Sequence, residues 1–546
     1  MDADNLKSPS FLEKYGAAIL LALGILFYSL LMWQYISFSP YAQIPILDAR
    51  SYWQLAIDVA HLGKPLTSTT HSAPLYPLFV TVCVYLFGPN IYAVYVIQLT
   101  LALLTLLLMY QLWQQLFSPL HAFIAALLSL YYLPFVFYIT KLLPEILAIL
   151  VLTSFLVIYT HRRLVNKPVG LILLGLVGGL AILARSQFIA VILPLIALLP
   201  FYRRADAPLN LRRWRVPMIL ACLILTLLPI GLYNYHNTGG FYVTAPNGGI
   251  TFYEGNNPRA TGTYCPIPGV SDDVNLQLED MVKVASSHLG RPVTIREADR
   301  YFWLQGIYFI KNNFVDWLKL ELRKIILLIN PKETFTIYDI YLERDMYLSF
   351  LYLFCINWGI LLPLSILGIV AIFYSKKELI KDILPLFVTG LVLIGVLLTF
   401  YVLDRYRLLL LPVLAGFAAH GTISLFELWR HKRLPLAVAG TAVFLSGISA
   451  ALLIKKPVAP GAWSNLGSIL VRVERFSEAE NVLQKALQTE PTNPVALNNM
   501  ISALLYQNKI EEALPLIDLL ATHPRFLEKA ATYRRLIVEM GSAFSP

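Results

Sequence analysis

Residues 15–36 read YGAAILLALGILFYSLLMWQYI, a run of 22 residues without a charged side chain. At a rise of about 1.5 Å per residue, a helix of this length crosses the hydrocarbon core of a bilayer. The run is longer than the core of a secretory signal peptide and no small-residue cleavage site follows it, so we expect an uncleaved anchor. The rest of the chain has the same character, because 57% of its 546 residues are hydrophobic and only 14% are charged. Soluble domains carry about a quarter charged residues, so the sequence predicts a polytopic membrane protein.

Eleven apolar segments are candidates for membrane spans. They are 15–36, 91–115, 119–139, 143–160, 169–185, 187–201, 216–233, 348–374, 383–402, 408–425 and 434–454. The segments 169–185 and 187–201 are short, and a hairpin that does not fully cross is an alternative for them. We therefore expect an all-α fold with a bundle of about 11 transmembrane helices.

The distribution of basic residues predicts the orientation of these spans. If the N-terminus is cytoplasmic, the inner loops hold sixteen Lys and Arg residues and the short outer loops hold six. Cytoplasmic loops of membrane proteins show such an excess. We expect the segments 37–90 and 234–347, and everything after 455, to lie outside. The predicted location is the inner membrane of a bacterium, with the C-terminal part periplasmic or extracellular.

The C-terminal part of the chain is charged and repetitive. The residues at repeat positions are Trp463, Leu466, Gly467, Ala479, Leu483, Ala486 and Pro491, followed 34 residues later by Leu497, Met500, Ile501, Ala513, Ile517 and Leu520. This period is typical of tetratricopeptide repeats, with a plain helical tail as the alternative. We predict a transmembrane domain over 1–455, with outer loops 37–90 and 234–347, and a repeat domain over 456–546. Two repeats bury little core, so we expect the repeats to lean on the membrane domain, a partner or another copy.

Charged side chains gather at the predicted outer ends of the spans. The stretch SYWQLAIDVAHL, 51–62, has the pattern of a helix in the interface plane, with Asp48 and Arg50 at its N-terminal end. The other charged or titratable side chains at these ends are Lys64, His71, Lys141, Glu145, Arg185, Lys324, Asp404, Arg405 and Arg407. Charges at the edge of a membrane are costly and often functional. Cations there would bind a phosphate, and a carboxylate would orient or deprotonate a hydroxyl.

Five stretches, in this order and sidedness, resemble bacterial glycosyltransferases of the GT-C type. They are LDARSYWQLA…LGKPL…HSAPLYPLF, LLPE before the fourth span, YNYHNTGGFYVTAPNGGITFYEGNNPRATG, LRKIILLINPKET and DRYRLLLLP. The nearest branch is related to protein O-mannosyltransferases and the aminoarabinose transferase, and the resemblance covers most of 15–425. It implies a GT-C-like bundle, hexosyl or pentosyl transfer and a role at the cell envelope.

The resemblance also implies roles for particular residues. The donor would be a sugar linked to polyprenyl phosphate, and the acceptor a lipid, a protein or a glycan on the outer face. The catalytic acid maps to Asp48 and a second acidic position to Glu145. The candidates for the donor phosphate are Arg50, Lys64, Arg405, Arg407 and Lys324, and those for the acceptor or its loop are His71, Tyr235 and Asn256. Family members often carry a further acid where this chain has Ala49, which leaves a divalent metal ion on Asp48 and Glu145 an open question.

Other interpretations stay open at this point. Asp48 is compatible with a simple helix cap, and Arg50 and Lys64 with headgroup anchors. A lipid-linked oligosaccharide ligase or polymerase, or a transporter or scaffold that binds a protein partner through the repeats, is the alternative function. Membrane lipids are expected partners, whereas nucleic acid is not. No GxxxxGK[ST] loop occurs, as suits a donor that arrives through the membrane.

Overall fold

The structure is a computed structural model of the chain, and it describes residues 11–63, 73–202, 209–238, 240–271, 274–375, 377–453 and 458–543. These residues are helical, with an isolated parallel bridge between Tyr132 and Ile356. They form two compact units. Unit 1 comprises Met1–Trp33, Leu47–Glu333 and Phe350–Ile454, and unit 2 comprises Gln34–Ile46, Thr334–Ser349 and Lys455–Pro546. The predicted division at 455 stays a prediction.

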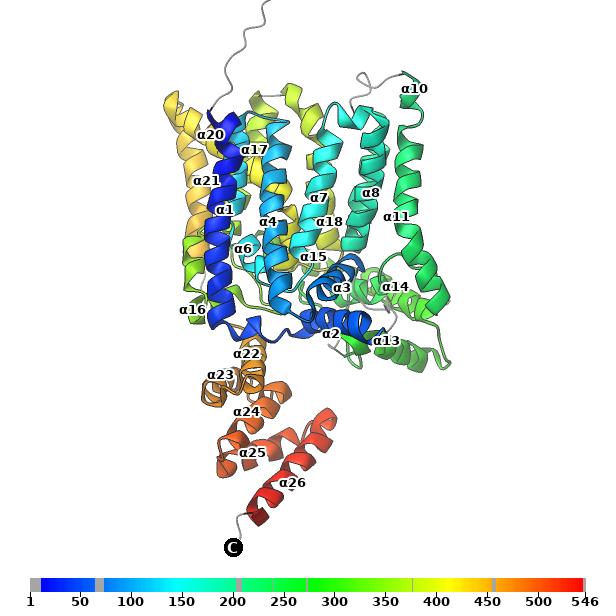
Figure 1. Cartoon of the computed structure of the whole chain (residues 1–546), viewed down its shortest axis with the longest axis vertical. Coiled ribbons are helices and arrows are strands. Elements are labelled where there is room, and N and C mark those ends of the chain that lie inside the picture. Colours follow the sequence, from blue (N-terminus) through cyan, green and yellow to red (C-terminus); the bar gives the residue numbers. More distant parts are fainter. Residues whose placement is uncertain are drawn as a thin grey trace, which may run out of the picture. The chain divides into compact units, whose positions relative to one another are not determined.

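Unit 1 is built around a bundle of apolar helices that run side by side (Figure 1). The bundle consists of α1 (Phe11–Phe38, whose last turn belongs to unit 2), α4 (Ile91–Gln114), α5 (Pro119–Leu130), α6 (Leu133–Ile139), α7 (Glu145–Thr160), α8 (Pro168–Ala184), α9 (Ile189–Leu198), α11 (Arg215–Thr238), α17 (Trp358–Ser375), α18 (Ile380–Thr399), α20 (Leu411–Arg430) and α21 (Leu434–Leu453). In the described part of the chain, five helices are long and apolar enough to cross a membrane, and further apolar helices are shorter. A multi-pass helical membrane fold is therefore confirmed.

Two of the predicted spans are interrupted at the same place. The segment 119–139 splits into α5 and α6, and the segment 348–374 becomes helical as α17 only at Trp358. Pro134 near the start of α6 cannot continue a helix from α5. The freed backbone groups pair with each other, because Leu133 N–H donates to the carbonyl of Ile356 (2.8 Å) and Ile356 N–H donates to that of Tyr131 (3.3 Å). Such internal pairing lets irregular backbone exist at membrane depth.

The segments between the spans carry helices of their own, which are α2 (Leu47–Leu62), α3 (Leu75–Phe87), α12 (Gly248–Gly255), α13 (Val274–Leu289), α14 (Ile295–Asn312), α15 (Phe314–Ile329) and the single turn α19 (Asp404–Arg407). Of these, α2, α3, α13 and α14 lie at one end of the bundle (Figure 1). The short helix α10 (Leu209–Arg212) lies at the other end (Figure 1). The apolar helix α3 lies in the predicted outer loop 37–90, where the sequence analysis placed no such helix. Met281, Ala298 and Phe302 belong to a small core of the long segment 234–347, whose helices α12 and α13 pack on α14.

Unit 2 contains the repeats as helix pairs. They are α22 (Pro460–Arg472) with α23 (Phe476–Thr489), and α24 (Pro494–Tyr506) with α25 (Ile510–Leu520), followed by α26 (Leu527–Ala543). Gly467 allows the close approach within the first pair, since a Cβ there would lie 2.4 Å from the Leu483 side chain. The small and apolar residues at the predicted repeat positions, such as Ala479, Leu497 and Ile517, are fully buried.

The repeats also pack on chain segments far from them in sequence. Asn465 donates to the carbonyl of Ile337 (3.1 Å), and the Tyr347 hydroxyl, just after α16 (Ile340–Met346), donates to Glu478 (2.5 Å). Gly461 lies against the ring of Phe335. Unit 2 therefore gains core from the residues between α15 and α17, which two isolated repeats lack.

Candidate functional site

The acid predicted to be catalytic lies in the first turn of α2 and meets an arginine from the far end of the sequence. Arg405 Nη1 donates to Asp48 Oδ2 at 2.9 Å, across 357 positions of sequence. The side chain of Asp48 is 20% exposed and that of Arg405 is 14% exposed. The pair is therefore partly shielded from water yet open to a ligand, which is where a charge interaction is both strong and usable.

The ring of Tyr406 lies close to this pair and to a second one. The guanidinium carbon of Arg405 lies 5.2 Å from the ring centroid, and that of Arg185 lies 5.1 Å from it. Cations at this distance are attracted to an aromatic ring. Tyr406 thus brings two guanidinium groups close to one ring, although α8 and α19 are more than 200 residues apart.

Arg185 forms the second ion pair with Glu145, the first residue of α7. Glu145 is fully buried, and its position at a helix N-terminus favours its negative charge. Its Oε1 accepts from Arg185, whereas its Oε2 has no hydrogen-bond partner. The Nε atoms of Arg185 and Arg405 are also buried without partners. Each ion pair therefore keeps unused hydrogen-bonding capacity.

The four charged side chains all influence the pKa of Tyr52, which lies one turn after Asp48 on α2. Burial raises the pKa of Tyr52, Asp48 and Glu145 raise it further, and Arg185 and Arg405 oppose them. The Tyr52 ring packs edge-on against Tyr76, at 5.3 Å between centroids. Tyr76 donates to Gln98, whose amide in turn donates to the carbonyls of residues 138, 139 and 141 (2.5–3.1 Å). This network of hydrogen bonds fixes the backbone just before Glu145 and the side chain of Tyr76, against which Tyr52 packs.

Arg407 has a different environment from Arg405, although both were predicted to bind the donor phosphate. Its side chain is 1% exposed and binds Glu333 (2.7 Å) and Asp404 (3.1 Å). It also donates to backbone carbonyls of Leu327, Leu328, Asn330 and Lys332, and lies 5.0 Å from the ring of Trp358. Two carboxylates and four carbonyls occupy its terminal nitrogens, so this arginine holds the end of α15 to α19.

Lys324 and Asn256 form a similar internal connection. Lys324 Nζ donates to Glu321 (2.7 Å), to the carbonyl of Leu398 (2.8 Å) and to Asn256 Oδ1 (3.4 Å). Asn256 Nδ2 donates to the carbonyls of Phe252 (2.9 Å) and Thr399 (2.8 Å). These bonds tie α12 and α15 to the end of α18, and they use the three N–H groups of the lysine.

The remaining predicted residues lie away from this cluster or outside the described residues. Arg50 and Tyr235 are exposed, on α2 and near the C-terminal end of α11. Lys64 and His71 lie outside the described residues. The structure thus brings together Asp48, Glu145 and Arg405 from the predicted site and Arg185 from the charges at the ends of the spans. It adds Tyr406 and Tyr52.

Arginines bind both carboxylates that the sequence offered for a divalent ion, Asp48 and Glu145. Among the described residues, no group of three or more His, Cys, Asp or Glu side chains is arranged to hold a metal ion. An arginine lies against each carboxylate, and a guanidinium competes with a cation for the same oxygens.

Comparison with known proteins finds a family model that matches part of the chain. Residues 71–232 match the family model described as dolichyl-phosphate-mannose-protein mannosyltransferase. The resemblance to GT-C glycosyltransferases is confirmed. Residues 470–525 match the tetratricopeptide repeat, so the predicted repeats are confirmed as well. No curated protein matches the chain significantly.

Solved structures similar to this chain include two of an archaeal oligosaccharyltransferase from Archaeoglobus fulgidus. The AglB structure in complex with an inhibitory peptide and a dolichol-phosphate has 14% identity and a TM-score of 0.47, over 86% of this chain and 60% of that one. The apo form has 14% identity and a TM-score of 0.45, with the same coverage. The chain therefore spans about 60% of the length of these structures.

Proposed function

We propose that this GT-C-type membrane protein is a transferase that moves a sugar from a polyprenyl-phosphate donor to an acceptor at the outer face of a bacterial inner membrane. The observation that carries the proposal is the pair of carboxylate–arginine contacts, Asp48 with Arg405 and Glu145 with Arg185, both beside the ring of Tyr406. Sugar transfer needs a carboxylate for the acceptor and cations for the departing phosphate, and this cluster offers both.

The donor phosphate would bind to Arg405 and Arg185. Guanidinium groups bind phosphate oxygens through parallel hydrogen bonds, and their charge opposes the negative charge that grows on the phosphate as the bond to the sugar breaks. Arg405 then exchanges its contact with Asp48 for the phosphate. Since Arg407 is enclosed by Glu333, Asp404 and backbone carbonyls, we leave it out of the proposed phosphate site.

Asp48 would act on the acceptor hydroxyl once its arginine has turned to the phosphate. The hydroxyl oxygen forms a bond to the anomeric carbon, its proton passes to Asp48, and the bond between that carbon and the phosphate oxygen breaks. Polyprenyl phosphate leaves and the configuration of the anomeric carbon inverts. Glu145 would hold Arg185 in position through its Oε1. Its Oε2 would accept a hydrogen bond from a hydroxyl of the ligand.

The acceptor and the role of the repeats belong to the same proposal. A site beside the amphipathic helix α2 can receive a lipid, protein or glycan acceptor at the membrane surface. The repeats of unit 2 would recruit a protein partner on the same, periplasmic side. Hexosyl and pentosyl donors both fit this chemistry.

Replacement of Asp48 by Asn tests the proposal. Glycans and polyprenyl-linked lipids are compared by mass spectrometry in a deletion strain that carries the wild-type chain or the variant. Loss of a general base lowers rates by about 10²–10⁴-fold, so the product should disappear and its donor should accumulate. Asp58→Asn on the same helix is the matched control, because that carboxylate accepts from Gln54 (3.0 Å) ten residues further along the chain. Full product from well-folded Asp48→Asn protein would remove Asp48 from the reaction.

A further inference from the structure

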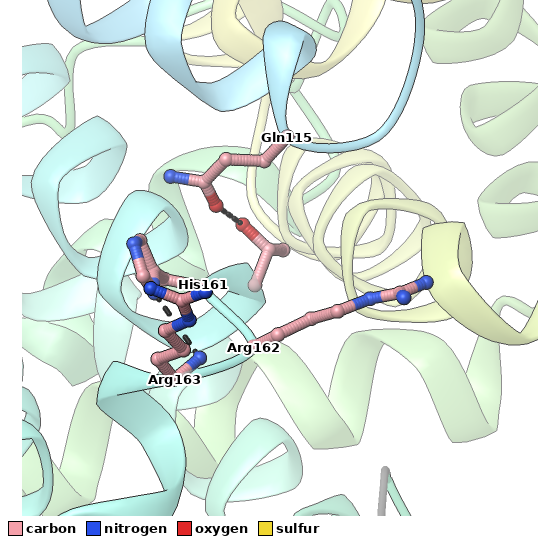
Figure 2. A pocket seen from close by; sticks show the side chains of 5 residues that line it. Gln115, His161, Arg162 and Arg163 are labelled. Carbon is pink, nitrogen blue, oxygen red and sulfur yellow. Dashed lines mark hydrogen bonds between the residues drawn. The ribbon is translucent and has the colours of Figure 1, made fainter. Parts of the chain in front are cut away.

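A cavity lies at the other end of α7 from Glu145. It has a volume of about 290 Å³ and is lined by Gln115, Thr160, His161, Arg162 and Arg163 (Figure 2). The 16 residues of α7, at about 1.5 Å per residue, place this cavity roughly 24 Å from the carboxylate at the start of the helix. It is therefore separate from the candidate site for sugar transfer.

The side chains that line this cavity offer hydrogen-bond donors. Nδ1 of His161 accepts from the backbone N–H groups of Arg163 (3.3 Å) and Leu164 (3.2 Å). A neutral imidazole that accepts at Nδ1 carries its proton on Nε2, which makes Nε2–H a donor. Thr160 donates its hydroxyl to Gln115 Oε1 (3.0 Å), while Gln115 Nε2 is buried without a partner. The orientation of this amide is visible in Figure 2.

The charge of the cavity is positive. None of the five described residues that line it is acidic, and two are arginines. The side chain of Arg162 is 70% exposed and forms an ion pair with Asp382 on α18 at 3.4 Å. It points away from the other labelled side chains (Figure 2). Arg163 lies beside His161 with its guanidinium exposed. A few hydrogen-bond donors and Arg163, set beside apolar surface, suit a compact anion with several acceptor oxygens that is attached to an apolar group.

We propose that this cavity binds a phosphate group, and that an anionic phospholipid of the adjacent leaflet supplies it. The cavity lies where the apolar helices α4 and α7 end, so a headgroup can enter while its acyl chains stay beside the helices. The basic residues of the predicted inner loops place it on the cytoplasmic side, where anionic lipids attract Lys and Arg side chains. The inference is independent of the proposed sugar transfer.

Native mass spectrometry of the full chain released from nanodiscs tests this assignment. Discs of phosphatidylcholine with one quarter phosphatidylglycerol serve as the probe. Wild-type protein should retain phosphatidylglycerol, and Arg163→Ala should lower the apparent affinity about fivefold, because one basic residue near a lipid surface contributes about that factor. Arg433→Ala is the matched control, because Arg433 is exposed in another predicted inner loop and does not line the cavity.

Competition distinguishes the two sources of phosphate. Millimolar inorganic phosphate or glycerol phosphate should leave the retained lipid unchanged if the acyl chains contribute to binding. Displacement by either soluble anion would overturn the lipid assignment. Equal retention by wild type, Arg163→Ala and Arg433→Ala would overturn the site itself. Wild-type retention should also fall as salt rises from 50 to 500 mM, and a salt-independent signal would count against an ionic headgroup contact.

Discussion

Arg405 and Arg407 are two residues apart in the motif DRYR, yet their environments differ completely. Arg405 is 14% exposed, pairs with the partly exposed Asp48 and lies beside the ring of Tyr406. Arg407 is 1% exposed and is enclosed by Glu333, Asp404 and carbonyl groups. Residues two apart on a helical turn point about 200° from each other, so one arginine faces the site and the other faces the protein. The comparison teaches that a charged motif at a membrane edge can divide into a ligand-binding residue and a structural one.

Of the two arginines, Arg405 should have the larger effect on activity. Arg405→Gln removes the charge that opposes the departing phosphate, and removal of one such group lowers rates by about 10²–10³-fold. The midpoint of thermal unfolding should fall less than it does for Arg407→Ala, because Asp48 is 20% exposed and water can replace part of the lost contact, whereas Glu333 and Asp404 are almost fully buried. Arg405→Lys keeps the charge without the two-pronged geometry and should recover part of the rate. If Arg405→Gln were as active as the wild type, Arg405 would not bind the donor phosphate, and the proposed difference in function between Arg405 and Arg407 would be wrong.

Loss of Arg407 should act on stability. Arg407→Ala leaves Glu333 and Asp404 buried without the guanidinium, and removal of one partner of a buried pair costs about 3–5 kcal/mol. The yield of folded protein and the midpoint of thermal unfolding in detergent should both fall. The double variant Arg407→Leu with Glu333→Gln should recover stability, since it removes opposite charges together. A stable but inactive Arg407→Ala would instead return this residue to the phosphate site.

Asn256 extends the structural side of the comparison. Asn256→Ala removes the two hydrogen bonds that its side-chain amide donates to the carbonyls of Phe252 and Thr399. It also removes one acceptor of Lys324, and we expect the free energy of unfolding to fall by about 1–3 kcal/mol. Unfolding midpoints measure this loss. Asn257→Ala is a useful control, because the side-chain amide of Asn257 donates to carbonyls of the adjacent end of α12, those of Tyr253 and Glu254. A larger effect at Asn257 would show that α12 is not held through Lys324.

The smallest effect should come from an exposed ion pair outside the bundle. The pKa of Glu297 is lowered to about 2, first by the hydrogen bond from Arg291 and then by the backbone N–H and hydroxyl of Thr294, which it caps at the start of α14. A depressed pKa means that the contribution is present above the ordinary pKa of 4.5 and is lost as the pH falls toward 2. Hydrogen exchange in the first turn of α14 should therefore rise between these values, after correction for the intrinsic rate. Glu297→Gln can still cap and should remove this pH dependence.

Sequence patterns predicted the helices better than the contacts between them. Helices appear at the eleven predicted spans, and the buried Ala479 and Ile517 confirm the repeat period. The break at Tyr131–Leu133 was missed because its hydrogen bonds come from Ile356, and periodicity cannot reveal a partner that far away. For the site, charge at the outer ends indicated Asp48, Glu145 and Arg405. Composition could not separate Arg405 from Arg407, and it gave no role to Arg185, whose partners Glu145 and Tyr406 are distant in sequence.

The packing of the repeats on residues 334–349 limits how the chain can be cut. Asn465 and Glu478 bind Ile337 and Tyr347, and η1 (Pro40–Ala42) packs on α22 within the same unit. A truncation at 455 would leave Tyr41 and Tyr338, now buried against each other at 5.4 Å, without the helices that help to cover them. The repeats therefore do not behave as an interchangeable fusion tag. A chimera that carries foreign repeats would have to import the matching surfaces at 34–46 and 334–349 as well.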